Sequence, residues 1–527
     1  MSKSSKKNVP KKNSSVRPYT VMCTDLYLLW ILLVYPLYYA DGYFHLPERK
    51  ATFWCTSTLV YIGVTLLGVI ITYVSTRDEW SLERIKKNIS MTDIFMFGFL
   101  ISNLIAFALS EDKTNAWTGA TGRYYGAKVL ILVCISYFLI SRYAWVNKVF
   151  IWAFLIAGNG VCLLATLDYF DFDVLGINSQ MRRIDQVLFF STIGNLNTCA
   201  SFVVMAVGCA MSYYCVGKKI KDKAFSIFSI MNCVMAICTV RSDSAVLGTA
   251  IVVILLILFA FSGKIKLKNV IEVIILSCCT VISFSFIRTH FTERCVGRIA
   301  YYNLVDDGIT RILWERTELF LSILICSIIV YSIFVYFEKK QVDVGKRICN
   351  RYIILCCVCL VSVVVVILLF KFNLVKVIRN GLGIDAESQI GTRVYMYEKA
   401  IEIFGQEPFI NKIFGNGQAL ISQLYNQYYG EELAIAGLSI NSCHDHVLDY
   451  LLTTGLLGAI CYFGIVISST ITVLKKEDGN LLGIVVFISF IAYFIQGFFN
   501  IEQVVTTVVF WLFIALNEAA WKKEEMN

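Results

Sequence analysis

The sequence predicts an all-α polytopic membrane protein with roughly 12–14 transmembrane helices and a large helical outer loop. The chain of 527 residues is 57% hydrophobic, and only 16% of its residues are charged, whereas soluble domains carry about 25% charged residues. Its mean hydropathy is +0.67. Apolar runs of roughly 18 residues or more, which are long enough to cross a bilayer as helices, recur from end to end. The composition therefore excludes a soluble enzyme with a single membrane anchor.

The apolar runs divide the chain into membrane spans and loops. We expect about fourteen spans, at approximately 22–40, 51–74, 92–110, 126–141, 149–167, 195–216, 224–240, 245–262, 270–287, 319–337, 352–370, 446–473, 481–499 and 504–521. No signal-peptide cleavage site follows the basic N-terminal segment, so we expect it to be retained. The predicted parts are a cytoplasmic basic tail (1–21), a first group of transmembrane helices (22–370), a large extracytoplasmic loop (371–445), C-terminal transmembrane helices (446–521) and a cytoplasmic tail (522–527).

The distribution of charge predicts which side of the membrane each loop faces. When the spans alternate from a cytoplasmic N-terminus, roughly 28 of the 47 Lys and Arg residues fall in short loops on the cytoplasmic side. This is the positive-inside pattern of a protein in the cytoplasmic (inner) membrane, and it puts both termini in the cytoplasm. Because topology explains most of the net charge of +9, we expect the lipid bilayer, and no nucleic acid, as a partner.

The sequence does not favour a disulfide framework or a metal site. Most of the nineteen cysteines lie inside apolar runs, where thiols behave as small hydrophobes, and none follows the paired spacing of a metal site. The His-x-His spacing of His444 and His446, with Asp445 and Asp449 beside them, leaves a metal site as an alternative. Since no other ligands lie nearby in the sequence, we expect no metal and no cofactor.

Two of the four histidines in the chain, His444 and His446, stand at the end of the large outer loop, directly before a long apolar run. Histidine is the side chain that titrates near neutral pH without perturbation, so it suits proton transfer. We expect His444 to act as a base, with Asp445 either holding the imidazole or capping the next helix. The alternatives are that His444 only caps the span, and that His446 packs or forms a hydrogen bond in the interior.

The stretch HDHVLDYLLTTGLLG resembles the late signature of the O-antigen ligase/polymerase family (Wzy-type polysaccharide polymerases and lipopolysaccharide O-antigen ligases). In that signature a histidine is followed by spaced leucines and glycines. The matching positions, with Asp445 in place of the usual Asn, are His444, Leu448, Leu451, Gly455 and Gly458. Further stretches resemble the family in the family's order, namely DGYFHLPERKATFW, NAWTGATGRYYG, FFSTIGNLNTCASF, GTRVYMYEKAIEIFGQEPFINKIFGNG and FIQGFFNIEQVVTTVVFWLF.

The resemblance implies a GT-C-like membrane glycosyltransferase with a lateral cleft and an outer helical cap. Such an enzyme transfers a glycan from undecaprenyl pyrophosphate to a sugar hydroxyl on the outer face, with inversion and without a metal. The implied partners are an undecaprenyl-pyrophosphate-linked oligosaccharide, an acceptor glycan and a chain-length regulator. We favour a polysaccharide polymerase, with an O-antigen-type ligase as the first alternative. A transporter or flippase of lipid-linked oligosaccharide is the second, although few ionisable residues lie inside the predicted spans.

A cation for the leaving pyrophosphate is predicted in the large outer loop. Thr392 suits a helix N-cap, which puts Arg393 in the first turn of the helix that follows. A cation there opposes the helix dipole unless a phosphate docks beside it, held by the guanidinium and by free backbone N–H groups. We therefore assign Arg393 a catalytic role beside His444; the alternative is a surface arginine paired with Glu387. We expect the apolar face of this helix to consist of Val394, Tyr397, Ile401 and Phe404.

Three further residues are expected to bind the substrate pyrophosphate. Arg123 lies in the stretch that resembles the family's loop before the fourth span; an interfacial anchor is its alternative role. Many family members carry, in a Thr-x-Ser-Arg-Gly stretch, an arginine that faces the lipid phosphate. In this chain Asp243 takes that position, and Arg241 lies two residues away. We expect the binding set to consist of Arg123, Arg241 and Asp445.

Overall fold

The computed structural model describes residues 16–75, 89–177, 181–291, 294–295, 309–339, 389–436, 439–475 and 481–522. The predicted span at 352–370, the extreme ends of the chain and the first part of the predicted outer loop lie outside these residues.

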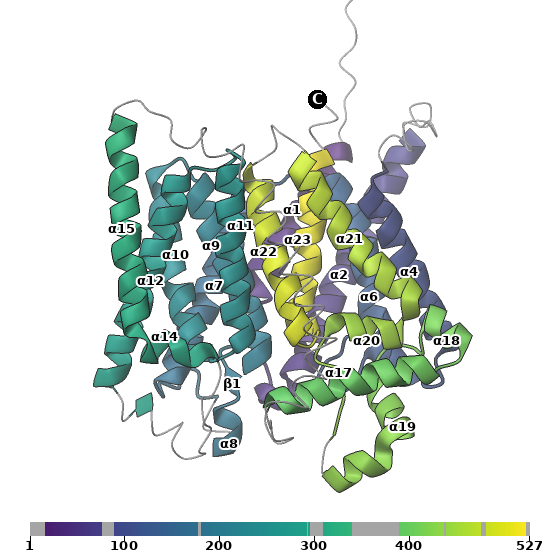
Figure 1. Ribbon diagram of the computed structural model, residues 1–527. Helices are drawn as coiled ribbons and strands as arrows, with labels where there is room; N and C mark the ends of the chain where they lie inside the picture. The colour runs from purple at the N-terminus through teal and green to yellow at the C-terminus, as the bar shows by residue number, and fades with distance from the viewer. Residues whose placement is uncertain are drawn as a thin grey trace, which may run out of the picture.

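Eleven helices in the described part of the chain are long and apolar enough to cross a membrane. They are α2 (Gly42–Ser75), α4 (Met91–Leu109), α7 (Lys148–Tyr169), α9 (Leu196–Val216), α10 (Ile220–Val240), α11 (Asp243–Phe261), α12 (Leu267–His290), α15 (Thr317–Lys339), α21 (Gly455–Lys475), α22 (Leu481–Gln496) and α23 (Val504–Lys522). The shorter helices in the bundle are α1 (Val16–Leu29), its continuation η1 (Trp30–Val34) and α6 (Ala127–Tyr143). This arrangement confirms the predicted all-α polytopic membrane protein (Figure 1).

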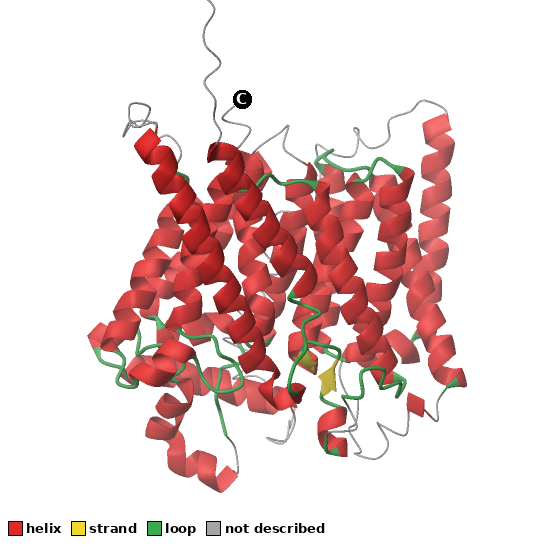
Figure 2. Cartoon of the chain, turned by 180° about the vertical axis from the view of Figure 1, so that it is seen from behind, coloured by secondary structure: helices red, strands yellow, loops and turns green. Residues whose placement is uncertain are grey.

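The helices differ in how deeply they lie in the bundle. In a bilayer every backbone polar group must be paired within its own helix, which is why apolar runs of this length fold as helices. α9 and α23 form the centre, because 94% and 100% of their spans are buried, whereas none of the span of α15 is buried. α15 accordingly stands at the edge of the bundle in both side views (Figures 1 and 2).

The sequence predicted one span over 446–473, and the structure divides this segment at Gly455. The short helix α20 (His446–Thr453) ends before it, and α21 begins at it in a different direction (Figure 1). Gly455 has φ +68°, and a Cβ at this position would collide with the carbonyl oxygen of Ile413. Only glycine allows this close approach. α20 therefore lies outside the membrane span and belongs with the helices of the outer loop.

The four histidines lie at one end of the bundle, and the lysines of two connections between spans lie at the other. The histidine end, which is the lower end in Figure 1, holds the start of α2, the end of α12 and the start of α20, where the four histidines lie. The lysine end is the upper one, and its connections α9–α10 and α11–α12 contain Lys218, Lys219, Lys264 and Lys266. The described helices thus alternate as predicted. Which end faces the cytoplasm stays a prediction.

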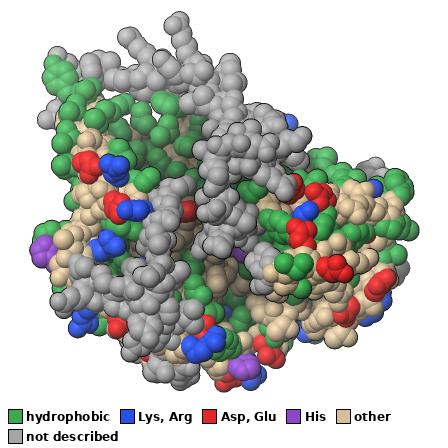
Figure 3. All heavy atoms as spheres, turned by 60° about the horizontal axis from the view of Figure 1, so that its bottom comes forward, with side chains coloured by type: hydrophobic (Ala, Val, Ile, Leu, Met, Phe, Trp, Pro, Cys, Tyr) green, Lys and Arg blue, Asp and Glu red, His purple; other side chains and the backbone are tan. Residues whose placement is uncertain are grey.

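Short elements connect the spans at the histidine end. β1 (Phe189–Phe190) pairs with β2 (Gly194–Asn195) in an antiparallel ladder, in which Phe189 lies opposite Asn195. The remaining short helices are α5 (Lys113–Thr118), α8 (Arg183–Gln186), η5 (Ile309–Arg311), α14 (Ile312–Glu315) and η6 (Gly497–Phe499). Figure 3 looks onto this end: charged side chains of both signs are spread over the face, and the surface is hollowed near its centre.

The described part of the outer loop forms a helical cap over the histidine end. Its helices are α17 (Gln389–Gln406), α18 (Phe409–Phe414) and α19 (Ile421–Ala436), and α20 lies against them (Figure 1). They enclose a small core of their own. The buried residues of this core are Ala400, Ile403, Ile421, Leu424, Tyr425, Leu433, Ile440, Cys443 and Leu452.

Two details of α17 differ from the prediction. The helix begins at Gln389, so the prediction that Thr392 is its N-cap was wrong, and Arg393 lies beyond the first turn. The apolar face is also shifted, because Ile401 is 41% exposed while Ala400 and Ile403 are buried. The cap core selects this face, and the pattern of apolar residues along the helix does not reveal where that core lies.

Labelling of an introduced cysteine tests the predicted orientation. We expect Asn426→Cys, at an exposed position of α19, to react in intact cells with a reagent that does not cross membranes. The background lacks the exposed thiols, which among the described residues are Cys279 and Cys326. Lys219→Cys, at the lysine end, is the control and should react only after the membrane is opened. The reverse pattern would invert the predicted orientation.

Candidate active site

His444 lies in the segment 439–445, which leads into α20 at the histidine end. Its backbone is left-handed, with φ +53°, a conformation that is uncommon for residues other than glycine. Its N–H donates to the Ser442 Oγ over 2.9 Å. The side chain is half-buried, and Nδ1 is buried without a hydrogen bond to any described residue. The backbone of His444 is thus held on its N-terminal side while this ring nitrogen is uncommitted.

Two arginines help to lower the pKa of the His444 imidazole. Burial, together with the positive charges of Arg393 and Arg123, lowers the pKa of His444 to about 4. The imidazole is therefore neutral at neutral pH and can accept a proton. Because a buried polar atom without a hydrogen bond is unfavourable, this ring is a candidate for contact with a ligand. The structure thus brings together three of the residues that the sequence singled out.

Arg393 lies on α17 four residues before Tyr397, so that the two side chains share one face of the helix. The Tyr397 hydroxyl donates to the His444 carbonyl oxygen over 3.3 Å, which keeps α17 beside the histidine. Arg393 is half-buried, and we find no hydrogen bond or ion pair from its guanidinium to a described residue. The predicted partner Glu387 lies outside those residues. A guanidinium in this state is suited to binding an anion.

Arg123 lies in the connection between α5 and α6 and is nine-tenths buried. Its Nη2 donates to Asn441 Oδ1 over 2.7 Å, and its Nη1 lies 3.7 Å from Asp449 Oδ2. Burial is the main influence on the ionisation of this pair. It lowers the pKa of Arg123 and raises that of Asp449, so it disfavours the charged form of each side chain. Arg123 thereby joins a connection between two spans to the segment that carries His444.

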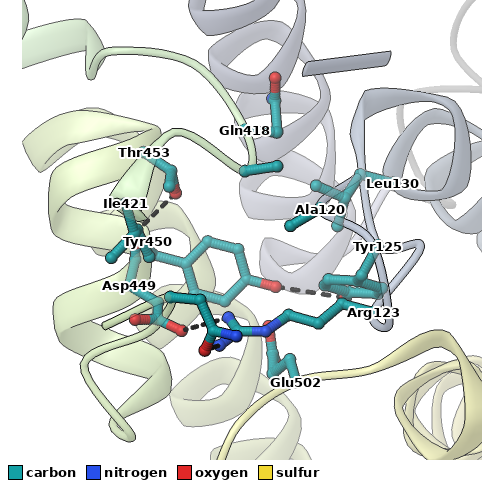
Figure 4. A pocket seen from close by; sticks show the side chains of 12 residues that line it. Ala120, Arg123, Tyr125, Leu130, Gln418, Ile421, Asp449, Tyr450, Thr453 and Glu502 are labelled. Carbon is teal, nitrogen blue, oxygen red and sulfur yellow. Dashed lines mark hydrogen bonds and ion pairs between the residues drawn. The ribbon is translucent and has the colours of Figure 1, made fainter. Parts of the chain in front are cut away.

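A cavity of about 50 Å³ lies beside this ion pair (Figure 4). Arg123, Tyr125, Asp449, Tyr450 and Glu502 supply most of its polar lining. The hydroxyls of Tyr125 and Tyr450 lie 3.2 Å apart. Burial raises the pKa of Glu502 to about 8, so this carboxyl is largely protonated at neutral pH and can donate a hydrogen bond. A cavity of this size and polarity has room for a few water molecules but not for a sugar.

Asp445 is used as a helix cap. Its carboxylate accepts the N–H groups of Val447 at 2.8 Å and Leu448 at 3.2 Å, which satisfies two free donors at the start of α20. The sequence left two roles open for Asp445, and in the structure its side chain caps α20. The side chain is 2% exposed, and this geometry gives no support to its predicted contact with the substrate.

His446 is fully buried and lies among aromatic side chains. Its ring centroid is 5.1 Å from those of Phe494 and Phe498 and 5.3 Å from that of Tyr462. A Cβ on Gly497 would collide with the His446 ring, so the ring packs closely against the backbone at Gly497. His446 therefore packs in the interior. Among the described residues, no group of three or more His, Cys, Asp or Glu side chains could hold a metal ion.

Arg241 is placed differently from the other two arginines. It is the C-cap of α10, with a left-handed φ of +54°, and its Nη2 donates to the Val187 carbonyl oxygen over 3.3 Å. It does not line the cavity beside Arg123. Asp243, which stands at the family's arginine position, accepts the N–H and the hydroxyl of Thr310. This geometry gives no support to a phosphate contact by Arg241.

Comparison with known protein families gives a match over part of the chain. Residues 315–463 match the family model described as O-Antigen ligase (Wzy_C). Over these residues the chain is similar to O-antigen ligases. This finding confirms the family resemblance predicted from the sequence. No curated protein matches the chain, and no solved structure does.

The matched region, residues 315–463, holds only part of the candidate site. α17 and α20 lie within it, so the matched region supplies Arg393, His444 and Asp449. Arg123 comes from before this region and Glu502 from after it. The site is consequently completed by connections between helices outside the matched region.

Several residues of this site were not assigned a role from the sequence. Tyr397 was expected only in an apolar face, and Asn441, Ser442 and Glu502 gave no signal of their own. Asp449 was considered only as a metal ligand. One local signal does exist for it: Asp449 follows the helix-capping Asp445 by four residues, which puts it on the face of α20 that turns back toward the segment before the helix.

Proposed function

We propose that the protein transfers glycan repeat units from undecaprenyl pyrophosphate to a sugar hydroxyl at the outer face of the cytoplasmic membrane, and that it thereby polymerises them. The observation that carries this proposal is a neutral His444 imidazole within electrostatic reach of Arg393, at one end of a membrane bundle. The Arg393 guanidinium makes no hydrogen bond or ion pair to a described residue. The match to the O-antigen ligase model, which covers both residues, supports the same class of reaction.

The reaction requires a base, and His444 has the properties of one. The acceptor hydroxyl attacks the anomeric carbon of the donor sugar, and the bond from that carbon to the phosphate oxygen breaks. The electron pair of this bond leaves with the pyrophosphate, and the hydroxyl proton passes to the imidazole. Attack opposite the leaving group inverts the anomeric centre. Because the pKa of His444 is lowered to about 4, the imidazole is free to take this proton at neutral pH.

Arg393 is suited to the negative charge that develops on the leaving pyrophosphate. Its planar guanidinium can bind two phosphate oxygens at once, and a cation that is already in position stabilises developing charge without reorganisation. An anion beside Arg393 also offsets part of the positive charge that lowers the His444 pKa, so the base becomes stronger when the donor is bound. Arg123, which Asn441 and Asp449 hold in place, adds to the positive field.

The position of the site agrees with a lipid-linked donor. The polyprenyl tail of such a donor lies in the bilayer and its pyrophosphate at the membrane surface, which is the level of the histidine end. A second lipid-linked glycan can present its terminal sugar at the same level, which favours a polymerase. A ligase acting on another acceptor would use the same residues for the same step.

The pH dependence of the rate follows from the lowered pKa of His444. With a pKa of about 4 in place of 6.5, the free enzyme keeps a neutral base down to about pH 5, so we expect a flat kcat/KM above that pH and a fall below it. The fall in kcat should begin at higher pH, because bound pyrophosphate raises the pKa. The unfolded chain takes up this proton near pH 6.5, so folding stability also decreases as the pH falls from 6.5 toward 4.

Initial rates between about pH 4 and pH 8, at varied donor concentration, measure both pH profiles. A decline of kcat/KM that is already complete at pH 6 would contradict a lowered pKa.

The intermediate that accumulates in cells without the protein tests the proposed function. We expect single repeat units on undecaprenyl pyrophosphate, accessible at the outer leaflet to a glycosidase added to spheroplasts. Polymer chains on undecaprenyl pyrophosphate would indicate a ligase, because polymerisation would then proceed without the protein. Single units confined to the inner leaflet would indicate a flippase and would overturn the proposal.

A further inference from the structure

The left-handed backbone of His444 requires support from its surroundings. A side chain with a Cβ is strained at φ +53°, and such a conformation persists only where neighbouring groups hold it. Helix α20 begins only at His446, so the helix itself does not impose this conformation. Hydrogen bonds on either side of the residue supply such support.

On the N-terminal side, the support consists of Ser442 and Asp449. The His444 N–H donates to the Ser442 Oγ at 2.9 Å, and this hydroxyl donates to Asp449 Oδ2 at 2.8 Å. The second carboxylate oxygen of Asp449 accepts the Cys443 N–H at 2.8 Å. One carboxylate on α20 thus fixes the residues just before the histidine. The side chains of Ser442 and Asp449 are almost entirely removed from solvent.

On the C-terminal side, the carbonyl group of His444 is held by α17. The Tyr397 hydroxyl lies 3.3 Å from the His444 oxygen and 3.4 Å from the Phe498 oxygen, so it lies between these two carbonyl groups. Asp445, the next residue, is fixed as the cap of α20. His444 is therefore held by hydrogen bonds on both sides, and those on the N-terminal side are shorter.

The geometry points to Ser442 and Asp449 as positioning residues that hold His444 in its left-handed conformation, with Nδ1 uncommitted and the ring near Arg393. This inference rests on the proposed function for the role of His444 as a base. The Asp449 carboxylate also pairs with Arg123, so the same residue joins the base to the second cation of the site. Loss of the hydrogen bonds of Ser442 and Asp449 allows the His444 backbone to relax toward negative φ, which moves the imidazole away from the acceptor hydroxyl.

A comparison of His444→Gly with His444→Ala tests the strain directly. Both variants lack the imidazole, and elsewhere in a chain glycine is the less stable of the two residues. At a positive φ the order reverses, so we expect the Gly variant to have the higher melting temperature in detergent. An Ala variant that melts at the same or a higher temperature would overturn the strained conformation. This readout needs no activity.

Ser442→Ala tests the positioning role in glycan transfer. We expect a fall in kcat of roughly 10- to 100-fold, because a displacement of about 1 Å has effects of this size, with little change in the KM of the donor. Ser442→Thr retains the hydroxyl and should retain most of the kcat. Ser285→Ala is the matched control; it removes a partly buried hydroxyl, bonded to Thr317, from the other half of the bundle, and it should leave kcat unchanged.

The outcomes separate the positioning role from the proposed function. If His444→Ala is inactive while Ser442→Ala keeps the wild-type kcat, the positioning role fails and the function stands. If the wild type transfers no glycan, the function fails, and the melting temperatures of the Gly and Ala variants still decide whether His444 is strained. If Ser442→Ala does not fold, Tyr397→Phe removes the hydrogen bond to the His444 carbonyl oxygen on the C-terminal side. We expect this variant to lower kcat more than KM. A wild-type kcat would then overturn the role of these hydrogen bonds in positioning His444.

Discussion

His444→Ala should abolish detectable polymer, with single repeat units accumulating on undecaprenyl pyrophosphate. The variant lacks the neutral imidazole whose pKa is lowered by burial and by the charges of Arg393 and Arg123, and general-base assistance is typically worth roughly 10²–10⁴-fold in rate. Quantification of lipid-linked intermediates and polymer from the same cells measures the effect. The amount of protein in the membrane must match the wild type, so that loss of insertion is not mistaken for loss of catalysis.

His446→Ala is the matched control for this experiment. His446 is fully buried among Tyr462, Phe494 and Phe498, so its loss leaves a cavity and lowers thermal stability. The rate per folded molecule should nevertheless fall far less than in His444→Ala. An equal loss of specific activity in the two variants would remove the distinction between a reacting histidine and a packing one.

Arg393→Lys should lower activity by roughly 10- to 100-fold, the range expected when a hydrogen bond to a charged group is lost. Lysine keeps the positive charge but lacks the planar fork that binds two phosphate oxygens. Membrane insertion and melting temperature should stay normal, because no hydrogen bond or ion pair to a described residue engages the Arg393 guanidinium. Rates with purified protein at saturating donor measure the loss.

Arg316→Lys provides the control for the loss of a guanidinium. Arg316 lies between α14 and α15, is 69% exposed and pairs with Glu318, so its replacement should leave the rate unchanged. If Arg393→Lys were as active as Arg316→Lys, Arg393 would be no more than a surface cation, and the leaving pyrophosphate would need another partner.

The membrane helices could be predicted because a bilayer imposes one simple requirement on each of them. A long apolar run must pair its own backbone groups, and it does so as a helix whatever its neighbours are. The break at Gly455 could not be read in this way. Both sides of it are apolar, and the positive φ is selected by the close approach of Ile413, which comes from another part of the outer loop.

Some residues of the candidate site could likewise be predicted from the sequence, and others could not. His444 and Arg393 could be singled out because scarce titratable and cationic groups stand out in an apolar sequence. The roles of Tyr397 and Glu502 depend on segments that meet only in the folded protein. Arg241, which was chosen for its nearness in sequence to a family position, does not line the cavity beside Arg123, and its contact with phosphate stays a prediction.

The most direct test of the central claim is chain growth by purified protein. The assay contains the native lipid-linked repeat unit in detergent, with EDTA present and without a membrane gradient, and the product lengths are resolved on a gel. We expect the wild type to extend the glycan and His444→Ala to leave the single unit unchanged. If the wild type extends no verified native substrate, or if His444→Ala extends it as fast as the wild type, the assignment of His444 as the base of a glycan-transfer reaction is contradicted.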